Sequence, residues 1–318
     1  MKVNTTRDPV RLMNASLCRA TGSVVDQLLG MRKGICKFNA DAGVRSALLY
    51  SEGWLLQWHE GPAEAVEQAW RLPAANCAHA PPRTIHRSVG PHGLIDTLHI
   101  ATLHNGDKAK DVARRFRRVE REHARGLSAE PVAIWNRLSA PCLAQSEEVE
   151  TDGRRDVVVV ASEYNDSVEL IKGIAERYRA TVGYQRLADC DFRSGDVGAA
   201  YVDVTHEGGM IRVNALSRRA LANSMVRLSL RNAECMVLLL GTRPHRAAML
   251  AASVAMTLNS AAARPAISLI APSPAIGAHA AELFAALPGI QLEDVRAGAS
   301  QRACIDAVLS VIRTKDQI

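Results

Sequence analysis

The stretch KFNADAGVRSALLYSEGWLLQWHEG, residues 37–61, decides the fold of the N-terminal part of this chain. It contains two apolar runs, Ser46–Tyr50 and Trp54–Glu60, separated by the sequence SEG at 51–53. Short apolar runs on either side of a glycine-containing turn are typical of a β-hairpin. We therefore expect two antiparallel strands joined by a tight turn.

Working outward from the hairpin, the chain supplies further strands and helices. They are strands at Pro9–Leu17, Arg83–Val89 and Ile95–Leu103 and helices at Ser23–Lys37 and Ala63–Leu72. The resulting order, β-α-β-β-α-β-β, predicts a ferredoxin-like sandwich with one extra strand. A helix over Asp107–Arg125 follows, which we expect to pack on the sheet or on a partner chain.

From residue 154 onward, strand and helix patterns alternate. Asp156–Ala161 is a continuous apolar run, as expected of a strand covered on both faces. A hairpin is predicted from Ala199–Thr205 and Met210–Leu216. The other predicted elements are helices at 167–179, 220–231, 246–259, 278–287 and 300–313 and strands at 235–240, 266–270 and 290–294. The fold class is therefore α/β, with an α+β ferredoxin-like domain followed by a doubly wound, mostly parallel sheet.

The domain boundaries follow from a change in composition. We expect one domain over residues 1–140 and a second over 154–318, with a linker at 141–153 that mixes acidic residues and proline without any periodicity. All four tryptophans precede this linker. The length of 318 residues agrees with two domains, since a domain typically has about 100–200 residues.

Composition excludes several classes of protein. A hydrophobic fraction of 47% with 23% charged residues is that of a globular chain. No apolar run approaches the ~20 residues that cross a bilayer, and the N-terminus lacks an apolar signal core, so we expect no membrane span and a cytoplasmic location. The seven cysteines are scattered without a CxxC pair, which favours reduced thiols over a disulfide framework or a zinc site, and no metal is expected.

The region 11–104 resembles the BLUF family of flavin-binding blue-light sensors. The matching positions are Asn39, the hairpin glycine, and Gln57 followed by Trp58 and Glu-Gly at 60–61. The resemblance implies that Asn39 and Gln57 hold the polar edge of a flavin, because an amide can donate and accept at once. The family's light-driven electron donor, a tyrosine on the first strand, falls on Asn14, while the serine two positions later is kept as Ser16.

An asparagine cannot donate an electron as a phenol does. We therefore expect the family's photochemistry to be absent and predict no bound cofactor, with FAD as the alternative. In that alternative the flavin site consists of Asn14, Ser16, Asn39 and Gln57.

The region 154–314 resembles the Ras-like small GTPases in the order of its elements. When the phosphate-binding loop of that family is laid on VVVVASEYNDS at 157–167, its glycines fall on Val160 and Asn165, its lysine on Asp166 and its hydroxyl on Ser167. A carboxylate in place of the lysine would repel phosphates. The resemblance therefore implies a nucleotide site that has lost its function.

Two further motifs of that family are altered. Asn214 and Ser217 stand where the family has the aspartate and glycine of its metal-binding strand end. Ala275 stands in place of the aspartate that reads guanine. We therefore predict no GTPase activity, and we expect Asp166 or Ser167 to act as a helix cap instead.

These patterns favour a non-enzymatic signalling protein that binds protein partners and forms a homodimer. One alternative is a flavin or small-ligand sensor that reports to the second domain. Others are a nucleic-acid-associated regulator, suggested by the net charge of +6, and a weak GTPase. The arginines between 114 and 125 indicate a solvated helix face or a surface for an anionic partner, and the histidines, His59 among them, are expected to be ordinary core or surface residues.

Overall fold

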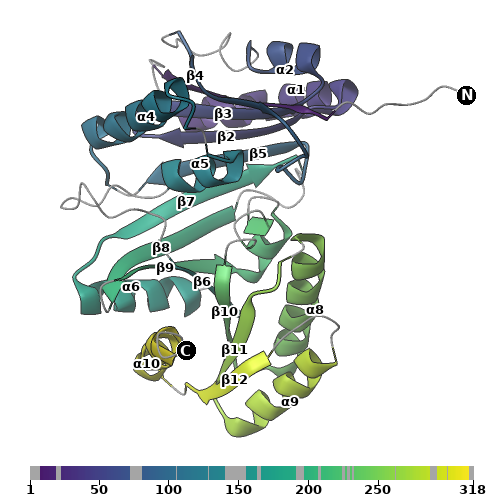
Figure 1. Cartoon of the computed structure of the whole chain (residues 1–318). Helices are drawn as coiled ribbons and strands as arrows, with labels where there is room; N and C mark the ends of the chain where they lie inside the picture. Colours follow the sequence, from purple (N-terminus) through teal and green to yellow (C-terminus); the bar gives the residue numbers. More distant parts are fainter. Residues whose placement is uncertain are drawn as a thin grey trace, which may run out of the picture. The chain divides into compact units, whose positions relative to one another are not determined.

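A computed structural model of the chain is shown in Figure 1. It describes residues 8–18, 23–71, 81–104, 106–127, 129–139, 155–162, 166–190, 197–206, 209–223, 226–227, 230, 233–261, 263–286, 292–298 and 300–314. Two compact units can be distinguished. The first is Met1–Ala144 with Arg186–Gly195, and the second is Gln145–Gln185 with Asp196–Ile318. The predicted linker at 141–153 lies outside the described residues.

The first unit is built on a mixed sheet with the strand order β5-β2-β3-β1-β4. The strands are β1 (Val10–Leu17), β2 (Arg45–Ser51), β3 (Trp54–Gly61), β4 (Arg83–Val89) and β5 (Leu98–His104). β3 is antiparallel to β1 and β2, β1 is antiparallel to β4, and β2 is parallel to β5. The predicted order of elements along the chain is thus confirmed, including the one extra strand.

The predicted hairpin is closed by a tight turn. Glu52 has a φ of 44° and Gly53 a φ of 85°, so both turn residues adopt left-handed backbone conformations. Two such residues in succession match the twist of the flanking strands, and glycine adopts this conformation without a steric cost.

Helices cover both faces of this sheet (Figure 1). On one face, α1 (Val24–Ala42) begins at the N-cap Ser23 and ends at Gly43, and α2 (Ala63–Ala69) lies beside it. On the other face lie α4 (Ala109–Ala124) and α5 (Pro131–Leu138). Trp54 stacks on Phe116 of α4 at 4.9 Å between ring centroids, so α4 packs on its own sheet.

The second unit contains a sheet in the order β12-β11-β10-β6-β9-β8. Its strands are β6 (Arg155–Ala161), β8 (Val197–His206), β9 (Gly209–Ser217), β10 (Ala233–Leu239), β11 (Ala266–Ala271) and β12 (Leu292–Ala297). All neighbours are parallel except β8 and β9, which form the predicted antiparallel hairpin. The helices are α6 (Asp166–Tyr178), α8 (Pro244–Ala261), α9 (Pro274–Ala285) and α10 (Gln301–Thr314). The α/β class is confirmed.

Three elements differ from the prediction. α5 was not predicted, and neither was strand β7 (Val182–Asp189), whose first half belongs to the second unit and whose last residues belong to the first. A continuous helix was expected over Ala220–Arg231, but the chain forms a 3₁₀-helix at Arg218–Ala222 and an extended residue at Asn223 before the α-helical residues Val226, Arg227 and Leu230. The expectation was wrong for the first residues, where the Ser217 side chain caps a 3₁₀-helix and Asn223 is extended, and it is confirmed at the three later positions.

The expectation of reduced thiols is wrong for two cysteines. Cys36 and Cys190 form a disulfide, although 154 residues separate them in sequence. Both belong to the first unit, because the segment Arg186–Gly195 folds with it. A contact over such a separation leaves no spacing pattern in the sequence. Among the described residues, Cys18, Cys235 and Cys304 take part in no disulfide.

Candidate functional site

A buried polar cluster lies on the face of the first sheet that α1 covers. Asn14 pairs with Gln57 across β1 and β3, and Ser46 pairs with His59 across β2 and β3. Residues directly opposite one another in antiparallel strands project from the same face. Leu48 lies two positions from Ser46 on that face and belongs to one hydrophobic cluster with residues of α1. All four polar side chains are buried.

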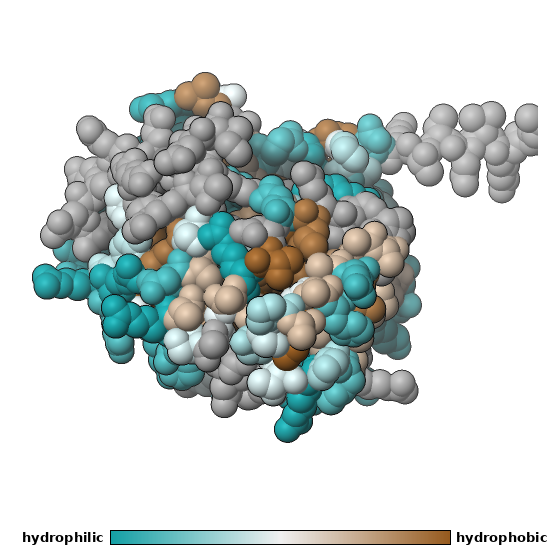
Figure 2. Space-filling view, turned by 90° about the horizontal axis from the view of Figure 1, so that it is seen from below, coloured by the Kyte–Doolittle hydropathy of each residue, from teal (hydrophilic) through white to brown (hydrophobic). Residues whose placement is uncertain are grey.

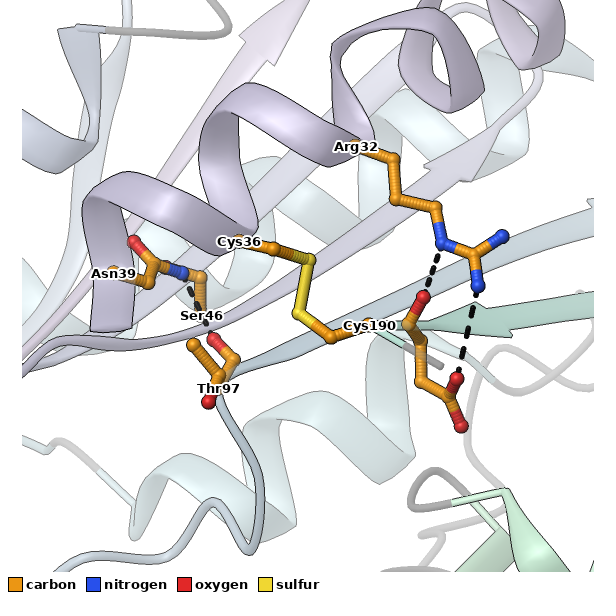
Figure 3. The surroundings of a disulfide bond; sticks show 7 residues. Arg32, Cys36, Asn39, Ser46, Thr97 and Cys190 are labelled. Carbon is orange, nitrogen blue, oxygen red and sulfur yellow. Dashed lines mark hydrogen bonds and ion pairs between the residues drawn. A yellow bond between two sulfur atoms is a disulfide. The ribbon is translucent and has the colours of Figure 1, made fainter. Parts of the chain in front are cut away.

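These side chains form a chain of hydrogen bonds with a fixed direction. Asn39 Nδ2 donates to the Thr97 carbonyl oxygen at 2.8 Å and to Ser46 Oγ at 2.9 Å, as drawn in Figure 3. Ser46 Oγ lies 2.8 Å from His59 Nδ1, and His59 Nε2 lies 3.3 Å from Gln57 Oε1. A carbonyl only accepts, so Asn39 presents its NH₂ group, Ser46 accepts from it and donates to Nδ1, and His59 carries its proton on Nε2.

We call this chain, from Asn39 through Ser46 and His59 to Gln57, the polar relay. Burial lowers the pKa of His59 from 6.5 to about 3, because the charged imidazolium would lose its hydration. The ring is therefore neutral near neutral pH, as the direction of the relay requires. His59 is a core histidine, as expected, but its link to two polar residues was not predicted.

Each end of the polar relay has one polar atom without a partner. Asn39 Oδ1 and Gln57 Nε2 are both buried and make no hydrogen bond. Leaving a buried donor or acceptor unpaired costs roughly 1–3 kcal/mol. The cluster therefore offers one free acceptor and one free donor to a molecule that carries both kinds of group.

The two predicted residues of β1 lie on the same face but outside the relay. Asn14 Oδ1 accepts a hydrogen bond from Thr84 Oγ1 at 2.9 Å, which directs its carbonyl toward β4 and away from β3. Ser16 is buried and pairs in register with Leu55. Among the four predicted flavin residues, the structure thus links Asn39 and Gln57 to each other.

Glu60 follows His59 on β3, and its side chain is hydrogen-bonded on the opposite face of the sheet. The fully buried Glu60 carboxylate accepts from Trp58 Nε1 at 3.0 Å and from the backbone N–H groups of Gly93 and Leu94 at 2.9 and 3.0 Å. His92 lies 3.3 Å from the same carboxylate. A Cβ on Gly93 would lie 2.9 Å from the Trp58 ring, so this close approach requires glycine. Glu60 therefore anchors the loop before β5.

The arginine-rich helix α4 is partly neutralised by its own acidic residues. Arg114 pairs with Asp111 at 2.6 Å, and Arg118 pairs with Glu122 at 3.1 Å. These are pairs three and four residues apart on an exposed helix surface, where each contributes only a few tenths of a kcal/mol. These exposed pairs favour the prediction of a solvated helix face for Arg114 and Arg118.

In the second unit, the predicted phosphate-loop positions do not form a cradle among the described residues. Val160 is fully buried within β6. Ser167 is buried in α6, and its Oγ has no partner, so it does not act as the helix cap that we expected. Asn165 lies outside the described residues, and Asp166 is described only as the first residue of α6.

The other altered motif positions have local structural roles. Ser217 Oγ accepts from the Ala220 backbone N–H at 3.3 Å and caps the 3₁₀-helix. Asn214 lies half-buried on β9, opposite Val158 of β6. Ala275 is exposed in the first turn of α9, whose N-cap is Ser273. Two positions where the GTPase motifs were expected thus lie at helix starts.

The described residues contain no group of three His, Cys, Asp or Glu side chains placed to hold a metal ion. No helix in this part of the chain has the length and apolar character needed to cross a bilayer.

No protein-family model matches the chain, and no curated protein matches it. Among solved structures it is similar to BlsA in its photo-activated state, with 17% identity and a TM-score of 0.30 over 44% of this chain and 99% of that one. It is similar to BlrB, a BLUF protein in its dark state, with 21% identity and a TM-score of 0.31 over 42% of this chain and 95% of that one. Klebsiella pneumoniae BlrP1 with FMN and cyclic diGMP has 11% identity and a TM-score of 0.29 over 97% of this chain and 87% of that one. TM-scores of this size do not establish a shared fold, so any assignment depends on the residues of the buried cluster.

Proposed function

We propose that this chain is a non-enzymatic signalling protein that acts through protein partners. In this proposal the first unit is a BLUF-like domain without photochemistry, and the second is a GTPase-like domain without nucleotide. The observation that carries the proposal is the polar relay, because it occupies the positions where such a domain holds its flavin and also restrains the glutamine that would have to move.

The relay explains why light would not switch this domain. In the BLUF family a tyrosine on the first strand drives a rearrangement of the glutamine. Here that position is Asn14, whose carbonyl is bonded to Thr84. The carbonyl of Gln57 is bonded to His59, so rotation of its amide would break a buried hydrogen bond. Loss of such a bond costs roughly 1 kcal/mol or more.

The same cluster has the polar groups to bind a flavin that would not respond to light. The unpaired Asn39 Oδ1 could accept from the ring N–H, and the unpaired Gln57 Nε2 could donate to a ring carbonyl or N5. When bound, a flavin would supply absorption of blue light and redox chemistry. This observation supports the second candidate function, a flavin or small-ligand sensor that reports to the second unit.

For the second unit, the strand order β12-β11-β10-β6-β9-β8 with one antiparallel pair supports the GTPase-like assignment. The capping roles of Ser217 and Ser273 support the loss of nucleotide binding, since both side chains serve the local backbone. Hydrolysis of GTP by the purified protein would contradict this part of the proposal.

Exposed hydrophobic side chains support binding to proteins. Met249 and Met256 of α8 are 47% and 74% exposed, and they lie seven positions apart on the same side of the helix. Figure 2 shows a face of the molecule on which hydrophobic residues lie at the surface among polar ones. A second copy of the chain is one such partner, and light scattering at micromolar concentration measures whether a homodimer forms.

The first experiment asks whether the protein binds a flavin. The full chain is produced with added flavin, and the absorbance in the blue and the small molecules released on denaturation are measured. If a flavin is bound, Asn39→Ala should reduce its occupancy at least tenfold, while the control Asn136→Ala on α5, at the opposite face of the sheet, should leave it unchanged. A colourless protein would contradict the second candidate function, the flavin sensor, and would be consistent with a non-enzymatic interaction protein.

The second experiment tests the restraint on the glutamine. In flavin-loaded protein, Asn14→Tyr alone should give no light-induced spectral change, because His59 still holds the Gln57 carbonyl. The double variant Asn14→Tyr/His59→Leu should give one. A spectral change in Asn14→Tyr alone would show that His59 does not restrain the glutamine.

A further inference from the structure

The disulfide between Cys36 and Cys190 attaches a short segment, Arg186–Gly195, to helix α1 of the first unit. Cys36 lies on α1, and Cys190 follows directly after β7. Its segment, Arg186–Gly195, belongs to the first unit, whereas the chain before and after it belongs to the second. The disulfide therefore joins α1 to a segment that is flanked on both sides in the sequence by residues of the second unit.

Two non-covalent attachments accompany the disulfide, and Figure 3 shows the one made by Arg32. The Arg32 guanidinium donates to the backbone carbonyl of Asp189 and lies 3.8 Å from its carboxylate. Ala188 is buried in the same hydrophobic cluster as Leu28 and Ile35 of α1. Arg32 is one helical turn before Cys36, so the ionic and covalent attachments lie side by side on one face of α1. Of these attachments, the disulfide is the one that ordinary cellular chemistry can make and break.

Neither cysteine of the disulfide belongs to the fully buried core. Cys36 and Cys190 are both half-buried, and they pack at the border of the hydrophobic cluster. Exchange depends on access of a thiolate to one of the two sulfurs. Cys18, a free and half-buried cysteine, packs against the same cluster and provides an internal comparison.

We propose that Cys36–Cys190 is a reversible thiol–disulfide exchange site, which takes a small thiol such as glutathione or a protein dithiol as its reductant. The reductant's thiolate attacks one sulfur of the pair, forms a mixed disulfide and releases the other sulfur as a thiolate. A second thiol attacks the mixed disulfide, which leaves two protein thiols and one reductant disulfide. Two electrons pass from the reductant to the pair, and reduction loosens the hold on residues 186–190.

The exchange site also lies next to the polar relay. Cys36 precedes Asn39 by three residues, so the two side chains leave α1 on the same side. Reduction thus changes the attachments of the helical turn that carries Asn39. This extension to the relay rests on the proposed function, whereas the exchange itself does not.

The experiment uses the full chain in a series of buffers with different ratios of reduced to oxidised glutathione, without denaturant. Thiols are trapped by alkylation and located by mass spectrometry, and amide hydrogen exchange is followed across residues 186–189. Cys36 and Cys190 should become alkylated together as the buffer becomes more reducing, and the amides should exchange at least tenfold faster in the reduced protein. Cys18→Ser should change neither result.

The double variant Cys36→Ser/Cys190→Ser should show fast exchange in every buffer. If the pair stays oxidised in excess glutathione and becomes reduced only after denaturation, it is a sealed structural bond and the proposal is wrong. If it is reduced but the amides exchange as slowly as before, Arg32 and the core hold the segment alone, which also overturns it. Neither readout depends on flavin or on a partner, so a colourless or monomeric protein leaves this test unaffected.

Discussion

Acid should destabilise the first unit through His59, the central residue of the polar relay. The folded protein holds the pKa of this ring at about 3, against 6.5 for an unperturbed histidine. The unfolded chain therefore takes up a proton as the pH falls through 6.5, while the folded chain resists protonation until about pH 3. Stability is fully present above pH 6.5 and is lost as the pH falls toward 3.

The size of the effect follows from the difference between the two pKa values. Each pH unit in this window removes about 1.4 kcal/mol from the free energy of unfolding. Between pH 7 and pH 5 the loss attributable to His59 is therefore about 2 kcal/mol, and the full loss near pH 3 is about 5 kcal/mol. The burial of His59, which is 1% exposed, justifies using the shift without a large correction for solvent screening.

The matched variant is His59→Gln, whose amide can accept from Ser46 and donate to Gln57 but does not titrate. Denaturant unfolding followed by tryptophan fluorescence reports on the first unit alone, because all four tryptophans lie within it. Groups such as His86, whose pKa burial lowers to about 4, contribute equally to both proteins. The difference in stability between them should shift by about 2 kcal/mol in favour of the variant between pH 7 and pH 5. Parallel pH profiles would refute the reasoning.

Three further substitutions test the packing of each unit. Arg212→Met should destabilise the second unit by about 3–5 kcal/mol, because it removes the guanidinium whose Nε lies 2.8 Å from the buried Asp203 carboxylate. Thermal unfolding followed by circular dichroism measures this loss, and the double variant with Asp203→Leu should recover much of it. Gly183→Ala should lower the melting temperature of the same unit, because the new Cβ would lie 2.3 Å from the Tyr201 ring; an unchanged melting temperature would contradict the close approach. Glu60→Gln should cost the first unit about 1–3 kcal/mol, because its NH₂ group would face backbone donors, and tryptophan fluorescence during unfolding would show it.

The sequence predicted the local elements well where their pattern is regular. The hairpin around Gly53 and the strand β6 were placed within a residue or two, since alternation and continuous apolar runs are properties of neighbouring residues. It did not predict β7, whose residues VGYQRLAD mix exposed and buried positions. Nor did it predict that the helix expected over Ala220–Arg231 begins as a 3₁₀-helix and is interrupted at Asn223, because the Ser217 capping bond depends on a side-chain orientation.

The candidate site was foreseen in part. Asn39 and Gln57 were singled out by their positions in the sequence, and the structure links them through two residues that were not, Ser46 and His59. The alternation of β2 and β3 was the available signal for this link, because it places Ser46 and His59 on one face once the register of the strands is known. The register between β2 and β3 could not be read from the sequence, so this link was not predicted.

The amino-acid sequence alone was sufficient for the α/β class and for the order of the strands along the chain, because both depend on residues that are near one another in the chain. Only the tertiary structure decided that the cysteines at 36 and 190 meet, that Asp189 belongs beside Arg32, and that the proton of His59 sits on Nε2. Each of these depends on contacts between residues far apart in sequence, and the free energy of such a contact is set by what surrounds it after folding.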